Sequence, residues 1–205
     1  AQLQVAAPVG TSEERVHLSL CTGTGGDVKA MEVVGAEFTR TISVEIDPVK
    51  RAICDNLNDS TVDHNWFNDV FQITQADVVA LGESATIARL SIAAPCKDFA
   101  MSRLLPSKFG GYLSNPRPGL KGKHGQVMLQ CLLIATWVLA MNTQCEVFCE
   151  NLKFDDLKED WQTVCKVLGD PLVIDAADHS CTRRVRAYWT VNMPLPPYEE
   201  LVKGF

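Results

Sequence analysis

The sequence predicts a doubly wound, mostly parallel α/β sheet. Short apolar runs of strand type alternate along the chain with longer segments of helical pattern, and such alternation is typical of βαβ units. With 205 residues and 46% hydrophobic content, the chain has the size of one compact domain with a sizeable core. We therefore expect residues 16–205 to form one domain and residues 1–15 to form an irregular leader.

Each element is predicted from its local pattern. Short apolar runs predict strands at residues 16–21, 41–45, 87–93, 145–150, 172–174 and 186–191. Longer periodic segments predict helices at residues 27–37, 48–58, 125–141 and 156–168. Residues 100–124 are rich in Pro and Gly and show no apolar period. We expect them to form a long loop at the active site, because stretches of this kind in compact domains are usually functional.

The charge distribution limits the way in which the chain can bind a polyanion. The formal net charge is -6 and the pI is near 5.2, so a surface that is basic all over is excluded. Between Phe99 and Cys145 there is no Asp or Glu, whereas several Lys and Arg fall there. This region predicts either a basic loop face for a polyanion or an ordinary solvated loop, and the sequence favours neither.

The eight cysteines lack the regular short spacing of a disulfide framework or a zinc site. We expect buried free thiols, a reducing compartment and no metal. The longest apolar segment, residues 127–141, is interrupted by Gln130 and Thr136, and it is too short to span a bilayer. It predicts a buried helix, so we expect no membrane partner, and residues 1–15 do not resemble a signal peptide.

A cofactor site is predicted from three strand ends. The first strand runs into a Gly-rich turn and a helix, which lets a ligand approach the backbone, although a simple tight turn is the alternative. Glu45 ends the second strand, where it can accept both hydroxyls of a ribose. Asp69 comes where a third strand should end, well placed to accept from an adenine amino group. Val28 replaces the third glycine of a nicotinamide fingerprint, so adenosine binding is favoured over a dinucleotide. The expected cofactor residues are Cys21, Thr22, Gly23, Thr24, Gly25, Gly26, Glu45, Ile46, Asp69, Val70 and Pro95.

A reactive group is predicted where the strand at residues 87–93 ends. Cys96 follows Pro95 at the rim of the sheet, whereas a structural cysteine would lie inside the strand. Thiolates are strong nucleophiles, and a nearby cation such as Lys97 raises the thiolate fraction. Cys96 is therefore the one cysteine predicted to be reactive.

Two further polar motifs follow later strands. Glu150 and Asn151 stand at the end of the strand predicted at residues 145–150, where a helix N-cap is the alternative interpretation of the carboxylate. Strand alternation puts Arg184 and Arg186 on one face. Such a pair can bind a phosphate or a base carbonyl, and a solvated strand edge is the alternative.

The order of these motifs resembles that of the cytosine-C5 methyltransferases over residues 16–194. Pro95-Cys96 and Glu150-Asn151 at this separation form a specific pair. Residues 175–180 and 184–189 look most like the eukaryotic de novo DNA methyltransferases, as do Gly119-Leu120, Gly122 and Gly125. The resemblance implies a Rossmann-like S-adenosylmethionine-dependent fold, S-adenosylmethionine as cofactor and a flipped cytosine in DNA as substrate. It also implies an intracellular protein, nuclear if the source is eukaryotic.

The resemblance further implies a role for each catalytic residue. The cysteine matching Cys96 adds to C6 of the cytosine, which activates C5 to attack the sulfonium methyl group. The glutamate matching Glu150 binds the N3 edge and supplies a proton, Arg184 and Arg186 hold the base carbonyl, and Asn151 orients the loop that carries the nucleophile. This division is chemically sensible, because a neutral pyrimidine is a poor acceptor until its ring nitrogen is protonated or hydrogen-bonded.

Two alternatives to a DNA enzyme remain open at this point. Only 16 residues follow Trp189, so the family's target-recognition domain and final motifs are expected to be absent. A catalytically silent or truncated homologue could keep the fold and pair with an active methyltransferase, as a homo- or hetero-oligomer. An RNA cytosine methyltransferase is the other alternative. Joint retention of the side chains of Cys96, Glu150, Arg184 and Arg186 favours the enzyme. Val28 disfavours a nicotinamide-dependent oxidoreductase.

Overall fold

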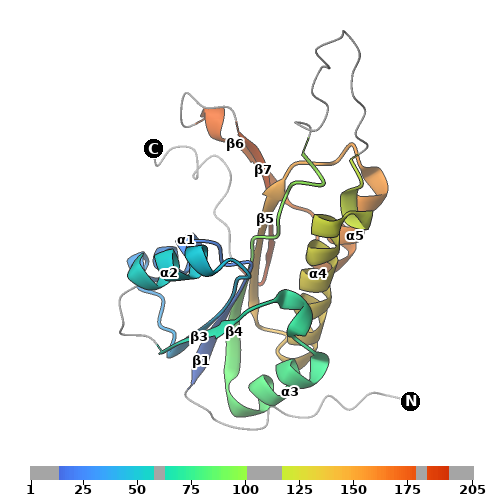
Figure 1. The fold of residues 1–205 in the computed structure, drawn as a ribbon. Coiled ribbons are helices and arrows are strands. Elements are labelled where there is room, and N and C mark those ends of the chain that lie inside the picture. The colour runs from blue at the N-terminus through green and yellow to red at the C-terminus, as the bar shows by residue number, and fades with distance from the viewer. Residues whose placement is uncertain (1–13, 58–62, 101–116, 179–183, 194–205) are drawn as a thin grey trace, which may run out of the picture.

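Seven strands form one sheet with the order β3-β2-β1-β4-β5-β7-β6 in the computed structural model (Figure 1), which describes residues 14–57, 63–100, 117–178 and 184–193. The strands β3, β2, β1, β4 and β5 run parallel to one another, whereas β7 runs antiparallel between β5 and β6. The strands are β1 Arg15–Leu20, β2 Arg40–Val44, β3 Asp63–Phe67, β4 Thr86–Ile92, β5 Glu146–Leu152, β6 Leu172–Asp175 and β7 Val185–Val191.

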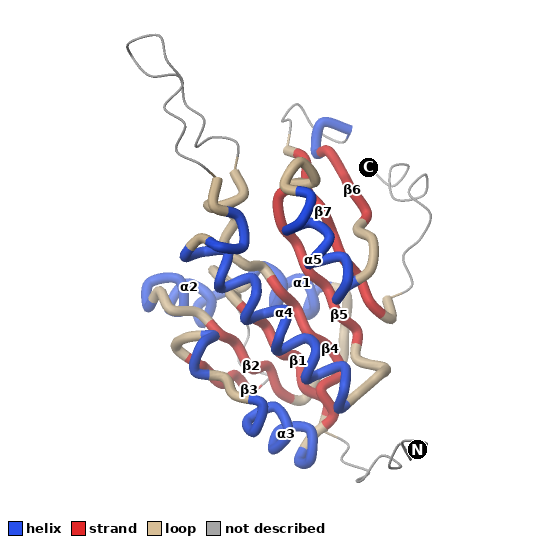
Figure 2. Tube along the Cα trace, turned by 90° about the vertical axis from the view of Figure 1, so that its right-hand side faces the viewer, coloured by secondary structure: helices blue, strands red, loops and turns tan. Residues whose placement is uncertain are grey.

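Helices cover both faces of the sheet. Figures 1 and 2 show α1 and α2 on one face and α3, α4 and α5 on the other. The helices are α1 Gly26–Val33, α2 Pro48–Leu57, α3 Gln75–Ser84, α4 Lys123–Met141 and α5 Lys158–Leu168, with short 3-10 turns η1 Val70–Gln72, η3 Gly119–Lys121 and η4 Ala176–Asp178. The strand order reverses between β1 and β4, and ligands of open α/β sheets bind at such a switch point.

The apolar core lies between the sheet and the face covered by α3, α4 and α5. Alternate residues of β1, namely Val16, Leu18 and Leu20, pack there with buried side chains of β4 and α4. By length and composition α4 could cross a membrane. It instead contributes buried residues such as Met128 and Ile134 to this core, which explains its apolar sequence.

The fold class predicted from the sequence is confirmed, and the predicted elements differ from the structure mainly at their ends. The helix predicted at residues 27–37 ends at Val33, and β5 continues through Leu152 because Asn151 and Leu152 pair with β7. Glu150 and Asn151 therefore lie within a strand and not after it. Helix α3 was not predicted, although Thr74 and Asp77 form a capping box at its start.

Candidate active site

A glycine-rich turn joins β1 to α1 at the carboxyl edge of the sheet. Gly23 and Gly25 have φ angles of 61° and 84°, a backbone conformation that glycine adopts without strain. A Cβ built on Gly23 would have no neighbour closer than 4.0 Å, and one on Gly26 would meet nothing within 4 Å. Gly23 and Gly26 therefore face open space, which lets a ligand approach the backbone where α1 begins. Thr24 is exposed between them.

Glu45 directs its carboxylate at this turn from the end of β2. Its Oε2 accepts a hydrogen bond from Gly23 N at 2.9 Å and its Oε1 accepts one from Asp47 N at 2.9 Å. Lys50 Nζ lies 4.0 Å from Oε1, and the Glu45 side chain is only 7% exposed. Because each carboxylate oxygen has a second lone pair, Glu45 can still accept hydrogen bonds from the hydroxyls of a ligand.

Apolar and acidic side chains adjoin each other at the neighbouring strand ends. Ile46, directly after Glu45, is 69% exposed. Asp69 follows β3 and caps η1, since its Oδ1 accepts from Phe71 N at 3.1 Å, and Val70 is buried beneath this turn. Exposed apolar side chains beside fixed carboxylates fit adenosine, which has a flat ring and a polar ribose.

The side chain of Cys21 faces the interior of the protein. Its thiol shares a hydrogen bond with that of Cys131 in α4, and the side chain packs against the core. The carbonyl oxygen of Cys21, at 4.0 Å from a Cβ built on Gly23, is the atom that lies beside the turn.

The segment that carries Cys96 is fixed on the side of β5. Pro95 and Cys96 follow the end of β4 at Ile92 after two alanines. Asn151 Nδ2 donates to Ala94 O at 3.0 Å, and the Asn151 side chain is buried. This bond joins the end of β5 to Ala94, two residues before Cys96.

The same segment is fixed on the side of α4. Asp98 Oδ2 accepts hydrogen bonds from His124 N at 2.7 Å and from Gly125 N at 3.2 Å, in the first turn of α4. Phe99 N donates to Cys96 O at 3.0 Å, which closes a tight turn. The segment with Cys96 is therefore held between β5 and α4, close to the switch point between β1 and β4.

The thiol of Cys96 differs from the buried thiols in its surroundings. Burial raises the pKa of Cys145 to about 12 and also raises the pKa of Cys149. The hydrogen bond with Cys21, followed by burial, raises the pKa of Cys131. These three groups stay protonated at neutral pH and are poor nucleophiles, whereas Cys96 is partly exposed and free of a disulfide.

Glu150 and Arg186 form an ion pair on the face of the sheet opposite α4 and α5. Arg186 Nε lies 2.7 Å from Glu150 Oε1, and the two side chains are 16% and 30% exposed. Tyr188 stands directly across from Glu150 in the β5–β7 pair, and burial followed by the charge of Glu150 raises the pKa of its phenol. Arg184, which also acts on this phenol, precedes β7 and is exposed. The predicted acid and arginines are thus brought to one strand pair.

Some predicted features lie outside the described residues. These are residues 101–116 of the predicted loop, most of the leader and residues 179–183. The described end of the loop forms η3 and the first turn of α4, which starts at Lys123. Across the described ranges, no three His, Cys, Asp or Glu side chains are placed to hold a metal ion.

Structural comparison identifies the class of fold. No family model and no curated protein sequence matches the chain. A Dnmt2 methyltransferase from S. pombe matches with a TM-score of 0.59 and 18% identity over 93% of this chain and 54% of that one. A DNMT2 mutant from Spodoptera frugiperda matches with a TM-score of 0.52 and 17% identity over 91% and 52%.

This similarity shows the fold, which is the α/β fold of the S-adenosylmethionine-dependent methyltransferases. The chain spans about half the length of these two structures.

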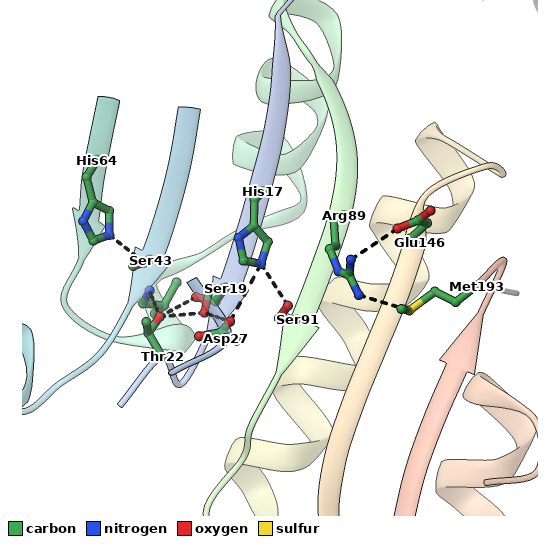
Figure 3. A network of polar contacts seen from close by, with 11 residues as sticks. His17, Ser19, Thr22, Asp27, Ser43, His64, Arg89, Ser91, Glu146 and Met193 are labelled. Atoms are coloured by element: carbon green, nitrogen blue, oxygen red, sulfur yellow. Dashed lines mark hydrogen bonds and ion pairs between the residues drawn. The ribbon is translucent and has the colours of Figure 1, made fainter. Parts of the chain in front are cut away.

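Sequence reasoning missed a set of polar residues behind the glycine turn (Figure 3). His17 and Ser19 in β1 and Ser91 in β4 are buried, and they are joined to Asp27 of α1. Polar residues at alternate positions of strands predicted to be buried on both faces were the available signal.

Proposed function

We propose that this chain is a DNA (cytosine-5-)-methyltransferase domain that transfers the methyl group of S-adenosylmethionine to C5 of cytosine through a covalent Cys96 adduct. The observation that carries the proposal is the position of Cys96. It is held at the β4 rim by Asn151 and Asp98, near the strand pair that bears the Glu150–Arg186 ion pair. The S. pombe protein of similar fold is named a methyltransferase, which supports methyl transfer as the type of reaction.

The residues at the glycine turn would hold the cofactor. Glu45 would accept from the ribose hydroxyls, and the open side of Gly23 and Gly26 would allow close approach of the remainder. Ile46 would pack on the adenine, with Asp69 accepting from its amino group. When bound, the cofactor supplies an electrophilic methyl group on a sulfonium.

The chain's own groups would prepare the base. The Glu150 carboxyl group would protonate N3, so that the pyrimidine accepts the nucleophile. The Cys96 thiolate would form a bond to C6, and the electron pair would move toward C5, which takes the methyl group and leaves S-adenosylhomocysteine. Loss of the C5 proton to solvent and cleavage of the bond between C6 and sulfur would restore the aromatic ring and the thiolate, and N3 would return its proton to the Glu150 carboxylate.

Arg186 would contact both the Glu150 carboxyl group and the cytosine. A guanidinium has five donors, so Arg186 can keep its contact with Glu150 and still donate to the carbonyl oxygen of the cytosine. Arg184 would assist from the exposed end of the same strand. The flipped base would have to reach the face of β5 and β7 that carries these side chains, and the predicted basic loop would contact the phosphates.

Covalent trapping tests the proposal directly. The protein and S-adenosylmethionine are incubated with oligonucleotides that carry 5-fluorocytosine in DNA or in RNA, and adducts are mapped by mass spectrometry. We expect an adduct at Cys96 with DNA. Cys96→Ala should abolish it, while Cys165→Ala, which removes another partly exposed free thiol, should leave it unchanged.

The other outcomes identify the alternatives. An adduct with RNA alone would replace DNA by RNA as substrate. No adduct, despite measurable binding of the cofactor, would identify a silent or truncated homologue that pairs with an active subunit. An adduct that survives in Cys96→Ala would refute the assigned nucleophile.

A further inference from the structure

The face of the sheet under α1 carries buried polar side chains where apolar ones are usual. His17, Ser19, Ser43 and Ser91 are at most 4% exposed, and they lie at alternating strand positions on three neighbouring strands. Figure 3 shows His17, Ser19 and Ser91 joined in one network with Asp27, while Ser43 is joined to His64. Buried strands of parallel sheets are normally continuous apolar runs, and burying polar groups is unfavourable unless they are hydrogen-bonded. We therefore looked for a functional role of these hydrogen-bonded side chains.

The network joins β1, β4 and α1. Ser19 Oγ donates to Asp27 Oδ2 at 2.6 Å. His17 Nε2 lies 2.8 Å from Ser91 Oγ and 3.7 Å from the same Asp27 oxygen. Asp27 stands in the first turn of α1, so these contacts fix the start of the helix relative to two strands.

Thr22 connects this network to the glycine turn. Its Oγ1 lies 2.9 Å from Ser19 Oγ and 3.0 Å from Ser19 O, and it accepts from Val44 N at 3.2 Å. Its backbone N donates to Val44 O at 3.0 Å. Gly23 follows Thr22, and Glu45 follows Val44. These two residues are also in contact, since Gly23 N donates to Glu45 Oε2. Thr22 thus sets the separation between the turn and the carboxylate.

We propose that Thr22 is a positioning residue for the cofactor site, and that Ser19, Asp27, His17 and Ser91 hold its hydroxyl in place. The inference rests on the proposed function, since it concerns the site assigned to S-adenosylmethionine. Thr22 contacts the turn and β2, and it acts on the cofactor only through Gly23 and Glu45. Hydrogen bonds on the α1 face, and not apolar packing, then determine how well the turn fits its ligand.

The test compares three variants of the whole chain. Thr22→Val removes the hydroxyl at nearly constant shape, and Thr22→Ser restores it. Thr41→Val removes a buried threonine hydroxyl from the other end of β2, so it controls for the loss of stability alone. Affinity for S-adenosylhomocysteine is measured by calorimetry, and hydrogen exchange of the Gly23 and Gly25 amides is measured without ligand.

The expected result is a loss of affinity of about tenfold in Thr22→Val, which corresponds to about 1.4 kcal/mol. Thr22→Ser and Thr41→Val should bind within about threefold of the wild type, a difference of less than 1 kcal/mol. The turn amides should exchange faster in Thr22→Val than in either of the other variants. Both results together support a positioning role that a general loss of stability would not produce.

Failure of this inference and failure of the proposed function give different results. Wild-type affinity and unchanged exchange of the turn amides in Thr22→Val would overturn the positioning role while leaving the cofactor assignment intact. A wild-type chain that does not bind S-adenosylhomocysteine would refute the proposed function. The exchange of the Gly23 amide would in that case still decide whether Thr22 fixes the turn.

Discussion

Gly125 lies where the first turn of α4 passes the Gly119–Leu120 turn. A Cβ built on Gly125 would come within 1.9 Å of Gly119 O and 2.6 Å of Leu120 Cα. Because both atoms belong to the backbone, we expect Gly125→Ala to reduce the free energy of unfolding by about 3 kcal/mol or more. Urea unfolding measures the change. Gly82→Ala is the control, since it meets only the flexible Met141 side chain, and equal stability of the two variants would contradict the packing argument.

His17 predicts a pH dependence of stability. Burial, with smaller contributions from the charges of Arg89 and His64, lowers its pKa to about 4 against the opposing effect of Asp27. The unfolded chain therefore binds a proton near the ordinary histidine pKa of 6.5, where the folded protein does not. As the pH falls from about 7 to about 5, we expect the free energy of unfolding to decrease by about 2 kcal/mol from this group.

Unfolding by urea at several pH values measures this effect. His17→Gln should show a shallower pH dependence over the same window, because the titrating group is gone. His124→Gln serves as the matched control and should keep the wild-type dependence. A pH dependence that His17→Gln leaves intact would assign the effect to other groups.

The two residues also show what sequence can predict at this scale. Gly125 was singled out through its resemblance to a family motif, but the reason for glycine is a backbone contact that only the folded chain creates. His17 gave no signal, because a single histidine in a strand looks the same whether it faces solvent or Ser91. Cys96 was predicted because proline and the end of a strand are adjacent to it in the sequence.

The first turn of α4 depends on Asp98, which is 2% exposed. Asp98→Ala would leave the amides of His124 and Gly125 without their acceptor inside the protein. We expect a loss of about 2 kcal/mol of unfolding free energy and slower trapping at Cys96, which lies on the same segment. Chemical unfolding and the trapping rate measure both, and Asp98→Asn, which keeps an acceptor oxygen, should retain most of each.

The bounds of helices and strands were predicted well where a local apolar pattern was clear. They were predicted poorly where pairing with a distant strand determines them. The strands β1, β2 and β4 are apolar runs whose bounds agree with the structure within one or two residues. The sequence of β3, Asp63–Phe67, is polar and aromatic, and only the end of this strand was inferred. The extension of β5 through Leu152 results from pairing with β7, a long-range contact that no local pattern contains.

The whole molecule should be stabilised by its cofactor. A ligand at about one hundred times its Kd adds about 2.7 kcal/mol to the free energy of unfolding, which for a chain of this size raises the Tm by about 5–10 °C. We expect S-adenosylhomocysteine to produce such a shift. NAD at the same concentration should produce none, and a shift with NAD alone would revive the dinucleotide alternative.

At this scale the doubly wound sheet was predictable and its last strand pair was not. Alternating strands and helices indicate parallel crossovers, and the described sheet follows this rule through β5. The antiparallel insertion of β7 places Glu150 opposite Tyr188 and beside Arg186. The sequence suggested that these residues act together, but the strand order that unites them depends on the fold of the whole chain.

The place of β7 in the sheet has a consequence for synthesis of the chain. Strand β6 is synthesised before β7, yet β7 is its only neighbour in the described sheet. The edge of β5 that faces away from β4 is also unpaired until β7 has been synthesised. A nascent chain that has emerged only to residue 184 therefore exposes an open edge of β5, and such edges promote association between chains. The ion pair of Glu150 with Arg186 forms in the same late step, so the proposed catalytic site is assembled only after most of the domain has left the ribosome.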